Sequence, residues 1–300
     1  MSHQTFDKVV ALLERDPVFQ SKGKKPQRPV KFQLVCFLIR YGSRGADTLE
    51  PVQKLLLGHG TVFIYCRRVT YALHCLRLRY VRWPEAELRA EISEAVEELA
   101  AIPGVIRIAN IQATVDHLRC FTSYEIGHGG SVPDVTIFKQ SHMWMHRPAY
   151  FELGQFILAD KGYPCSPYTL RPFAENELRQ RIEVEHAFGD LKGRFQALKC
   201  FGGTDNMPEL FRAVEALIIL HNICIEFGDQ AADIPGFTVD DIYPSGGEGN
   251  EDEDIEESQE IMACVGIANG TRNRPGETDK SMKRRGKALR LDILDIVVPP

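Results

Sequence analysis

Charge is segregated along the 300-residue chain, and this limits which parts can share one fold. Residues 1–83 hold 15 Lys and Arg against 5 Asp and Glu, whereas residues 84–228 hold 13 against 20. Residues 229–300 hold 8 against 16. The net charge of −5 therefore conceals a basic head, an acidic middle and an acidic tail. Such asymmetry indicates a polyanionic partner for the head and a solvated tail.

Several protein classes are excluded by the composition. The longest apolar runs, such as Ala216–Leu220, fall far short of the roughly 20 residues that a membrane span needs. The first residues lack the basic and then apolar pattern of a secretory signal, which predicts an intracellular protein. The eight cysteines form no Cys-x-x-Cys, so we expect reduced, mostly buried thiols rather than a zinc ribbon or disulfide framework.

Three helices are predicted in the basic head. Apolar residues recur at helical spacing over 29–41, over 48–57 and from Thr61 to Leu76. This succession, with a Gly-containing turn before the last helix, is that of a helix-turn-helix. Residues 22–82 contain 13 basic and 2 acidic side chains, a concentration suited to phosphate contacts.

DNA contacts are predicted on the third of these helices. Thr61 is its predicted N-cap, the residues up to Tyr65 would approach base edges, and Arg67 and Arg68 would face phosphates. The candidate DNA-binding residues are therefore Thr61, Tyr65, Arg67 and Arg68. The same residues also fit a three-helix packing module with a solvated basic face.

The middle of the chain has a mixed pattern of strands and helices. Residues 85–101 predict an acidic connecting helix, and β-rich stretches over 108–116 and 119–126 predict a hairpin that turns at Asp116-His117. Residues 134–140 are expected to be helical despite their β-branched side chains. Helical and β-rich stretches thus follow one another in this part of the chain.

Two carboxylates of the middle are candidate metal ligands. The apolar stretch 155–159 ends at Asp160 and a Gly turn, which would place this Asp at the C-terminal edge of a sheet. Glu185 lies on the inward stripe of the predicted helix 175–198 and so needs a cation or a partner. An intrahelical pair with Arg181 is the alternative.

Histidines give a weaker signal. His142 and His146 have the i,i+4 spacing of transition-metal ligands, but without a third ligand they are interpreted as surface or packing residues. His221, on the apolar helix 208–227, is interpreted as a core histidine.

Three blocks in order resemble a known family. Asp160-Lys-Gly-Tyr-Pro164, Arg181–Phe195 and Leu220-His-Asn-Ile-Cys224 are similar to the later motifs of PIF/Harbinger-type transposases, which are DDE superfamily endonucleases. The Gly-rich loop 127–134 and the predicted helix-turn-helix also match, so the resemblance covers roughly residues 28–228.

The resemblance implies an α/β fold of the ribonuclease-H-like type, with a central mixed sheet and flanking helices. It also implies two Asp and one Glu that hold two divalent cations, Mg²⁺ or Mn²⁺, for phosphoryl transfer on DNA. Asp160 corresponds to the second acidic residue and Glu185 to the third, which makes both catalytic and metal-ligand candidates. The corresponding expectation is a nuclear or intracellular protein that has DNA as its partner; a homo-oligomer also fits, since transposases generally act as multimers.

The first acidic residue of the family is missing. The family carries it in an Asp-Gly-Thr segment on its first strand, but here Pro103-Gly-Val-Ile continues directly into the stretch that ends at Asp116. The catalytic domain is therefore expected to lack its first strand, which would leave a gap or an unpaired edge. Asp116 and Asp134 are the nearby substitutes, and Asp116 aligns with a different family position.

Four segments are predicted: a helix-turn-helix domain (22–83), a helical connector (84–102), the endonuclease-like domain (103–228) and an acidic, largely disordered tail (229–300). The tail prediction rests on residues 213–271, which contain 14 Asp and Glu and neither Lys nor Arg. Lys283-Arg284-Arg285 is a weak nuclear-localisation pattern. Two functions fit: a DDE nuclease, impaired by its missing Asp, or a non-catalytic DNA-binding or partner-binding protein derived from a transposase.

Overall fold

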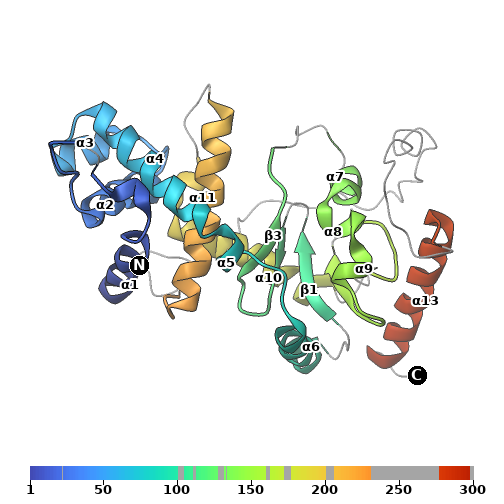
Figure 1. Ribbon diagram of the computed structural model, residues 1–300. Helices are drawn as coiled ribbons and strands as arrows, with labels where there is room; N and C mark the ends of the chain where they lie inside the picture. The colour runs from blue at the N-terminus through green and yellow to red at the C-terminus, as the bar shows by residue number, and fades with distance from the viewer. Residues whose placement is uncertain are drawn as a thin grey trace. The chain divides into compact units, whose positions relative to one another are not determined.

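The computed structural model describes most of the chain and has an α/β fold in which helices predominate (Figure 1). The described residues are 1–21, 23–100, 105–110, 113–127, 132, 134–159, 163–171, 177–200, 206–230 and 277–297. Within this set, the side chains of 99–100, 105–110, 134, 177–185 and 294–297 are not described. The chain divides into two compact units, each of which combines segments far apart in sequence.

Unit 1 comprises Met1–Arg82 and His186–Tyr243, and its described elements are helical. The first group of elements is α1 (His3–Leu13), η1 (Pro17–Phe19), α2 (Val30–Gly42), α3 (Leu49–Leu55), α4 (His59–Cys75) and α5 (Arg77–Tyr80). The second group comprises the C-terminal part of α10 (Glu177–Arg194), η2 (Gln196–Lys199) and α11 (Met207–Glu226).

The three helices predicted in the basic head are present as α2, α3 and α4. Helix α4 begins three residues earlier than predicted, because Gly58 rather than Thr61 stands at the N-cap and the backbone N–H of Thr61 donates to the Gly58 carbonyl. The predicted apolar side of α4 is confirmed, since Val62, Val69 and Leu73 are fully buried.

Helix α4 packs against α2 on one side and α11 on another. The α11 helix supplies a continuous apolar surface that runs from Ala216 to Leu220, and all five of these residues are buried. Asn222 on the same helix donates to the Tyr80 carbonyl at 2.7 Å. Unit 1 therefore joins the basic head to a helix that lies about 140 residues later in the chain.

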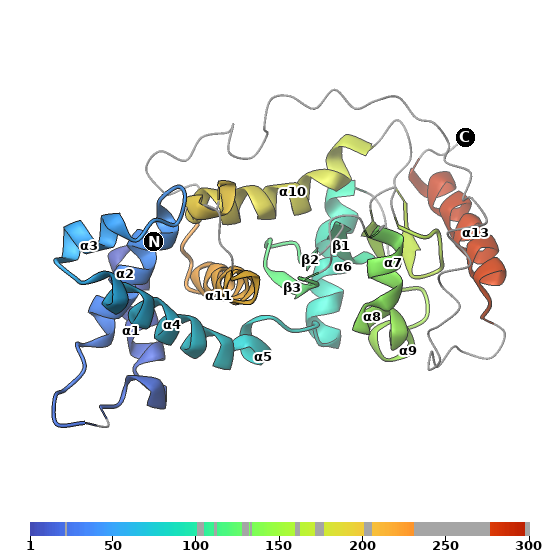
Figure 2. The same ribbon diagram turned by 90° about the horizontal axis from the view of Figure 1, so that it is seen from above.

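Unit 2 comprises Trp83–Glu185 and Pro244–Pro300 and contains a five-stranded mixed sheet (Figure 2). Its strands are β1 (Val105–Asn110), β2 (Ala113–Val115), β3 (Phe121–Tyr124), β4 (Phe156–Ala159) and β5 (Thr169–Leu170), in the order β3-β2-β1-β4-β5. Its helices are α6 (Ala86–Ala100), α7 (Asp134–Gln140), α8 (His142–Met145), α9 (Arg147–Tyr150), the N-terminal part of α10 and α13 (Asp279–Val297). The predicted connecting helix, the hairpin and the helix at 134–140 are confirmed as α6, β2–β3 and α7.

Strand β1 occupies the position where the sequence predicts a gap. It pairs antiparallel with β2 and parallel with β4, so it is hydrogen-bonded on both sides in the middle of the sheet. The expectation of a sheet without its first strand is therefore not confirmed. The residues that follow Pro103-Gly104 form this strand themselves, although the Asp-Gly-Thr segment is absent from the sequence.

The C-terminal part of the chain differs from the predicted tail. Residues 231–276 lie outside the described set, but Asp279–Val297 forms helix α13, which packs on unit 2. Both ribbon views place it beside α7–α9. Met282 of α13 is buried in a cluster with Phe138, Trp144, Tyr163 and other aromatic residues, so this helix is part of the core of unit 2 rather than a disordered segment.

None of the helices in the described part of the chain is long and apolar enough to cross a membrane. The seven cysteines described are free thiols, but only Cys36, Cys66 and Cys224 are buried. The prediction of mostly buried thiols is therefore correct for these three and wrong for the exposed Cys75 and Cys200.

Candidate functional site

Four residues near the start of α4 are the predicted DNA contacts, and they differ in how far the structure exposes them. Arg67 is exposed, and Thr61 and Arg68 are half-buried. The side chain of Tyr65 is 7% exposed and packs in the core of unit 1. The periodicity of the sequence already assigned Tyr65 to the apolar stripe, and burial favours that role over contact with bases.

Three large apolar or aromatic residues on α4 are exposed; Phe63 and Ile64 lie in the stretch predicted to approach base edges, whereas Tyr71 was missed by the sequence analysis. Phe63, Ile64 and Tyr71 are 42%, 51% and 58% exposed, and Arg40 of α2 lies over the Phe63 ring at 4.8 Å. Large apolar side chains beside arginines provide both stacking surfaces and charge for a nucleic acid. The sequence gives a signal for this exposure: the three residues lie between the buried residues of the apolar stripe, so they face away from that stripe on a helix.

Acidic residues of α11 pair with basic residues of the head. Glu209 lies 3.6 Å from the Arg67 guanidinium, while Glu215 lies 3.3 Å from His74 and 3.9 Å from Arg77. Sequence spacing gives no signal for these contacts because they join helices far apart in the chain. These ion pairs offset part of the positive charge that was predicted to face DNA.

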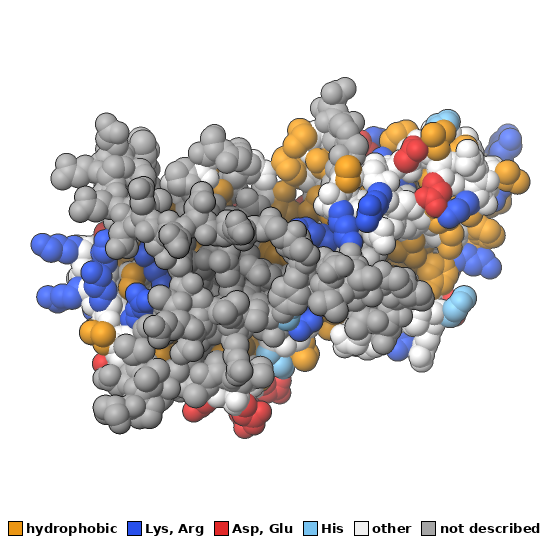
Figure 3. All heavy atoms as spheres, turned by 180° about the vertical axis from the view of Figure 1, so that it is seen from behind, with side chains coloured by type: hydrophobic (Ala, Val, Ile, Leu, Met, Phe, Trp, Pro, Cys, Tyr) orange, Lys and Arg blue, Asp and Glu red, His pale blue; other side chains and the backbone are white. Residues whose placement is uncertain are grey.

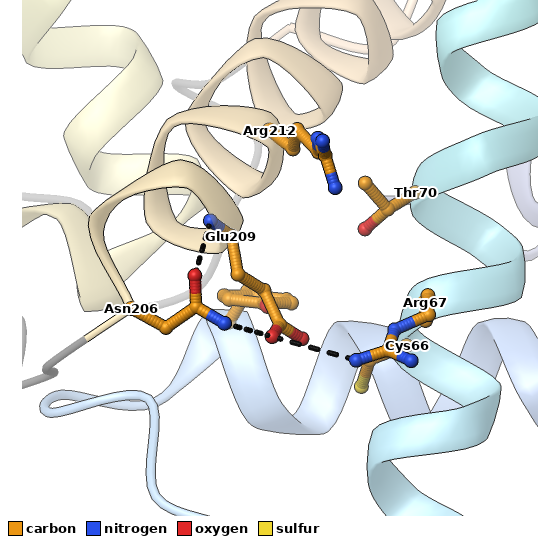
Figure 4. A pocket seen from close by; sticks show the side chains of 7 residues that line it. Cys66, Arg67, Thr70, Asn206, Glu209 and Arg212 are labelled. Atoms are coloured by element: carbon orange, nitrogen blue, oxygen red, sulfur yellow. Dashed lines mark hydrogen bonds and ion pairs between the residues drawn. The ribbon is translucent and has the colours of Figure 1, made fainter. Parts of the chain in front are cut away.

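A pocket of about 320 Å³ opens between α4 and α11 (Figure 4). Asn206 caps α11 by accepting a hydrogen bond from the Glu209 backbone N–H, and its side-chain amide donates to the Glu209 carboxylate at 3.1 Å. The residues that line the pocket are Tyr41, Cys66, Arg67, Thr70, Asn206, Glu209 and Arg212.

The electrostatics of this pocket are dominated by Arg67, Arg212 and Glu209. Burial raises the pKa of Tyr41 to about 12, against the opposing effect of Arg40, so its phenol stays protonated at neutral pH. The carboxylate of Glu209 lies 3.6 Å from the Arg67 guanidinium and acts as its counter-ion. Part of the positive charge of this pocket is therefore offset within the contact between the two helices.

The predicted catalytic carboxylates lie at the limit of the described region. Asp160 is outside the described residues, and Glu185 lies in helix α10 without a described side chain. Strand β4 ends at Ala159, directly before Asp160 in sequence, as the sequence analysis predicted. Whether Asp160 and Glu185 approach each other stays a prediction.

The backbone register shows what faces the end of β4. Ala159 is in register with Ala109 of the parallel strand β1, and the next residue of β1 is Asn110. Asn110 is itself paired with Ala113 of β2, so its backbone is fixed from the other side. An asparagine thus ends the central strand at the level where β4 leads into Asp160.

Of the two predicted substitutes for the missing Asp, Asp116 has a structural role. Asp116 is 6% exposed, and its Oδ1 accepts hydrogen bonds from the backbone N–H groups of Leu118 and Cys120, both at 2.9 Å. These bonds stabilise the β2–β3 turn. Asp134 begins helix α7, and its side chain lies outside the described set.

No group of three or more His, Cys, Asp or Glu side chains that could hold a metal ion is found among the described residues. The rings of His142 and His146 stack at 4.1 Å, and His142 Nδ1 lies 2.6 Å from the Tyr150 hydroxyl. Both side chains are exposed, which agrees with their interpretation as surface or packing histidines. His221 is fully buried, as expected for a core residue.

Comparison with known proteins gives one match. No curated protein and no solved structure matches the chain. A family model described as "DDE superfamily endonuclease" matches residues 107–222, which span β1 to most of α11 and include both Asp160 and Glu185. This part of the chain is therefore similar to the DDE superfamily endonucleases.

Proposed function

We propose that this protein is a transposase-derived, nuclease-like protein that binds duplex DNA and does not cleave it. The similarity of residues 107–222 to DDE superfamily endonucleases supports the nuclease-like origin. The central mixed sheet with flanking helices supports a ribonuclease-H-like fold for unit 2. The PIF/Harbinger subtype is proposed from the sequence motifs.

The proposed loss of cleavage rests on the register of β1 against β4. A two-metal site of this family needs an Asp on the first strand as well as Asp160 and Glu185. Asn110 ends that strand in this chain, one residue beyond the pair Ala109–Ala159. A neutral amide supplies one oxygen ligand but no negative charge, and hard divalent cations prefer carboxylates.

The residues therefore do not fit a two-metal site. Two carboxylates can offset only part of the charge of two divalent cations. No phosphoryl-transfer step is derived for this chain. A competing function, metal-dependent cleavage, is favoured by the family match alone.

DNA binding is assigned to the head. We propose Thr61, Arg67 and Arg68 as phosphate or base contacts, with Phe63 and Ile64 exposed beside them, while Tyr65 supports the helix from inside. Lys199, whose pKa is lowered by burial and by the nearby Arg44 and Lys192, indicates further positive charge in unit 1. Phosphate contacts of this kind are sequence-independent and salt-dependent.

Two assays on the full chain test the proposal. A supercoiled plasmid incubated with the protein and Mg²⁺ or Mn²⁺ should remain intact, while a mixed-sequence duplex should bind with an affinity that falls as salt rises. Metal-dependent nicking that disappears in Asp160→Ala would overturn the non-cleaving part. An affinity that is independent of salt, or no binding at low salt, would overturn the DNA-binding part.

A further inference from the structure

Helix α13 is anchored on unit 2 by small and apolar side chains. Met282 and Ile293 are 3% and 4% exposed. At Gly286 a Cβ atom would lie 2.5 Å from the Ser166 backbone nitrogen, so only glycine permits this approach. These three residues share one side of the helix, because at 100° per residue they fall within an arc of about 40°.

The docked helix directs a row of cations away from the core. Lys280, Lys283, Arg284 and Lys287 are exposed, and their positions fall within an arc of about 100° next to the buried side. We call these four residues the basic face of α13. Figure 3 shows Lys and Arg side chains gathered at the edge of the molecule where α13 lies.

The basic face has little acidic counter-charge. Residues 280–290 contain six Lys and Arg and no Asp or Glu, and the preceding Asp279 pairs with Lys139 at 3.3 Å. Arg285 points to another side of the helix, where it lies 3.9 Å from the Glu277 carboxylate. In the part of the chain that the structure describes, Lys280, Arg284 and Lys287 form no ion pair. A row of cations with this imbalance is a surface for a polyanion.

The spacing of these cations matches a nucleic-acid backbone. Lys280 and Lys287 are seven residues apart, which is about 10 Å along a helix that rises 1.5 Å per residue. Duplex DNA carries one phosphate per about 3.4 Å of each strand, so about three successive phosphate spacings cover a similar length. Docking through Met282, Gly286 and Ile293 fixes the row in place, which lowers the entropy lost on binding.

We infer that the basic face of α13 is a second DNA-binding surface, located on unit 2, that contacts the phosphate backbone of duplex DNA without reading its sequence. This inference rests on the proposed function only in naming duplex DNA as the partner. The residues involved are separate from α4 and from the carboxylates that resemble metal ligands. The residues of the Lys283-Arg284-Arg285 pattern do not share one side of the helix, since Lys283 and Arg285 lie about 160° apart around its axis.

The test measures the affinity of the full chain for a short mixed-sequence duplex over a range of salt concentrations. The variant replaces Lys280, Arg284 and Lys287 with Gln. Loss of three phosphate contacts should lower the slope of log K against log salt by about 2 to 3. Arg285→Gln is the matched control on another side of α13 and should change the slope by less than about 1.

A second variant separates this inference from the proposed function. Arg67→Gln/Arg68→Gln removes charge from the head alone. If the head variant lowers the slope and the α13 variant does not, the inference about α13 is wrong and binding by the head stands. If only the α13 variant lowers it, the inference stands and binding by the head is wrong. Should the triple variant melt at a lower temperature, the single Arg284→Glu variant replaces it, and an unchanged affinity then overturns the inference.

Discussion

Arg147 and Glu277 form a buried ion pair across 130 residues of sequence. Nε and Nη2 of Arg147 donate to Glu277 Oε2 at 3.3 and 3.1 Å, and the two side chains are 1% and 2% exposed. Tyr168 donates to the other carboxylate oxygen, while Nη1 of Arg147 donates to the Trp144 carbonyl. The segment before α13 is thus fixed to unit 2 by a satisfied polar network.

Removing the carboxylate of Glu277 should destabilise unit 2. Glu277→Ala leaves the Arg147 guanidinium buried without its counter-ion, which costs about 3–5 kcal/mol for buried pairs of this kind. Urea unfolding followed by tryptophan fluorescence measures the change, since Trp83 and Trp144 both lie in unit 2. Asp279→Ala is the control, because its partner Lys139 lies at 3.3 Å in an exposed pair. Equal losses from both variants would contradict a special role for Glu277.

A side chain at position 286 should weaken the docking of α13. Gly286→Ala places a Cβ 2.5 Å from Ser166 N and 2.6 Å from its Cα, so the backbone must shift. Overpacking of this kind costs about 1–3 kcal/mol, against a gain of about 1 kcal/mol from the helix propensity of Ala. Hydrogen exchange of α13 amides should accelerate in this variant. The exposed Ala288→Gly change should lower helix propensity without that steric clash, and faster exchange in this variant alone would refute the close contact.

Unit 1 should lose stability in acid through Asp229. Burial, the largest single effect, raises the pKa of this carboxyl, but hydrogen bonds from the Ser2 backbone N–H and from Arg194 outweigh it and hold the pKa below its usual value. The folded pKa lies below the unfolded one, so the stabilisation is present above about pH 4 and is lost as pH falls through the folded pKa.

The stability of unit 1 is measured in the full chain by urea unfolding between neutral and acid pH, with the circular dichroism of the helices as the signal. Asp229→Asn should lower stability at neutral pH by roughly 3–5 kcal/mol and flatten the acid dependence. Asp190→Asn on α10 serves as a comparison for the change of one negative charge. If both variants keep the full acid dependence of the wild-type protein, Asp229 is not its source.

Freeing Arg67 should strengthen DNA binding by the head. Glu209→Gln removes the negative charge 3.6 Å from Arg67 while it keeps an amide that can bond to Asn206. Exposed ion pairs contribute about 0.2–1 kcal/mol, so the affinity at low salt should rise up to about fivefold. Glu226→Gln, near the other end of α11, changes the net charge equally and should have a smaller effect. A weaker affinity in Glu209→Gln would show that Glu209 supports binding instead.

Restoring a carboxylate at the end of β1 should improve cation binding. Asn110→Asp adds negative charge at the level where β4 leads into Asp160, and ligand charge strongly affects the affinity for hard cations. Calorimetric titration with Mn²⁺ should show binding about tenfold tighter than in the wild-type protein. The gain should disappear in Asn110→Asp/Asp160→Ala, and a gain that survives there would contradict the proposed proximity of the two positions.

Local periodicity predicted the helices of the head and the β2–β3 hairpin, because those patterns depend on residues close in sequence. The first residue of α4 was missed, since the Gly-rich turn offers Gly58 as well as Thr61 as a cap. The tail was predicted to be largely disordered because of its acidic composition, but its residues Asp279–Val297 form helix α13, whose buried side holds Met282, Gly286 and Ile293 between many charges. Its order depends on Ser166 and Arg147, which are distant in sequence.

In the candidate site, too, some features follow from the sequence and others only from the tertiary structure. The sequence by itself determined the segregated charge, the order of the three motif blocks and the absence of an Asp-Gly-Thr segment. Only the tertiary structure decided that β1 fills the centre of the sheet, that Asn110 follows the pair Ala109–Ala159, and that α11 carboxylates pair with the head. Strand register and interhelical ion pairs join residues far apart in the chain, so no local pattern encodes them and packing alone brings them together.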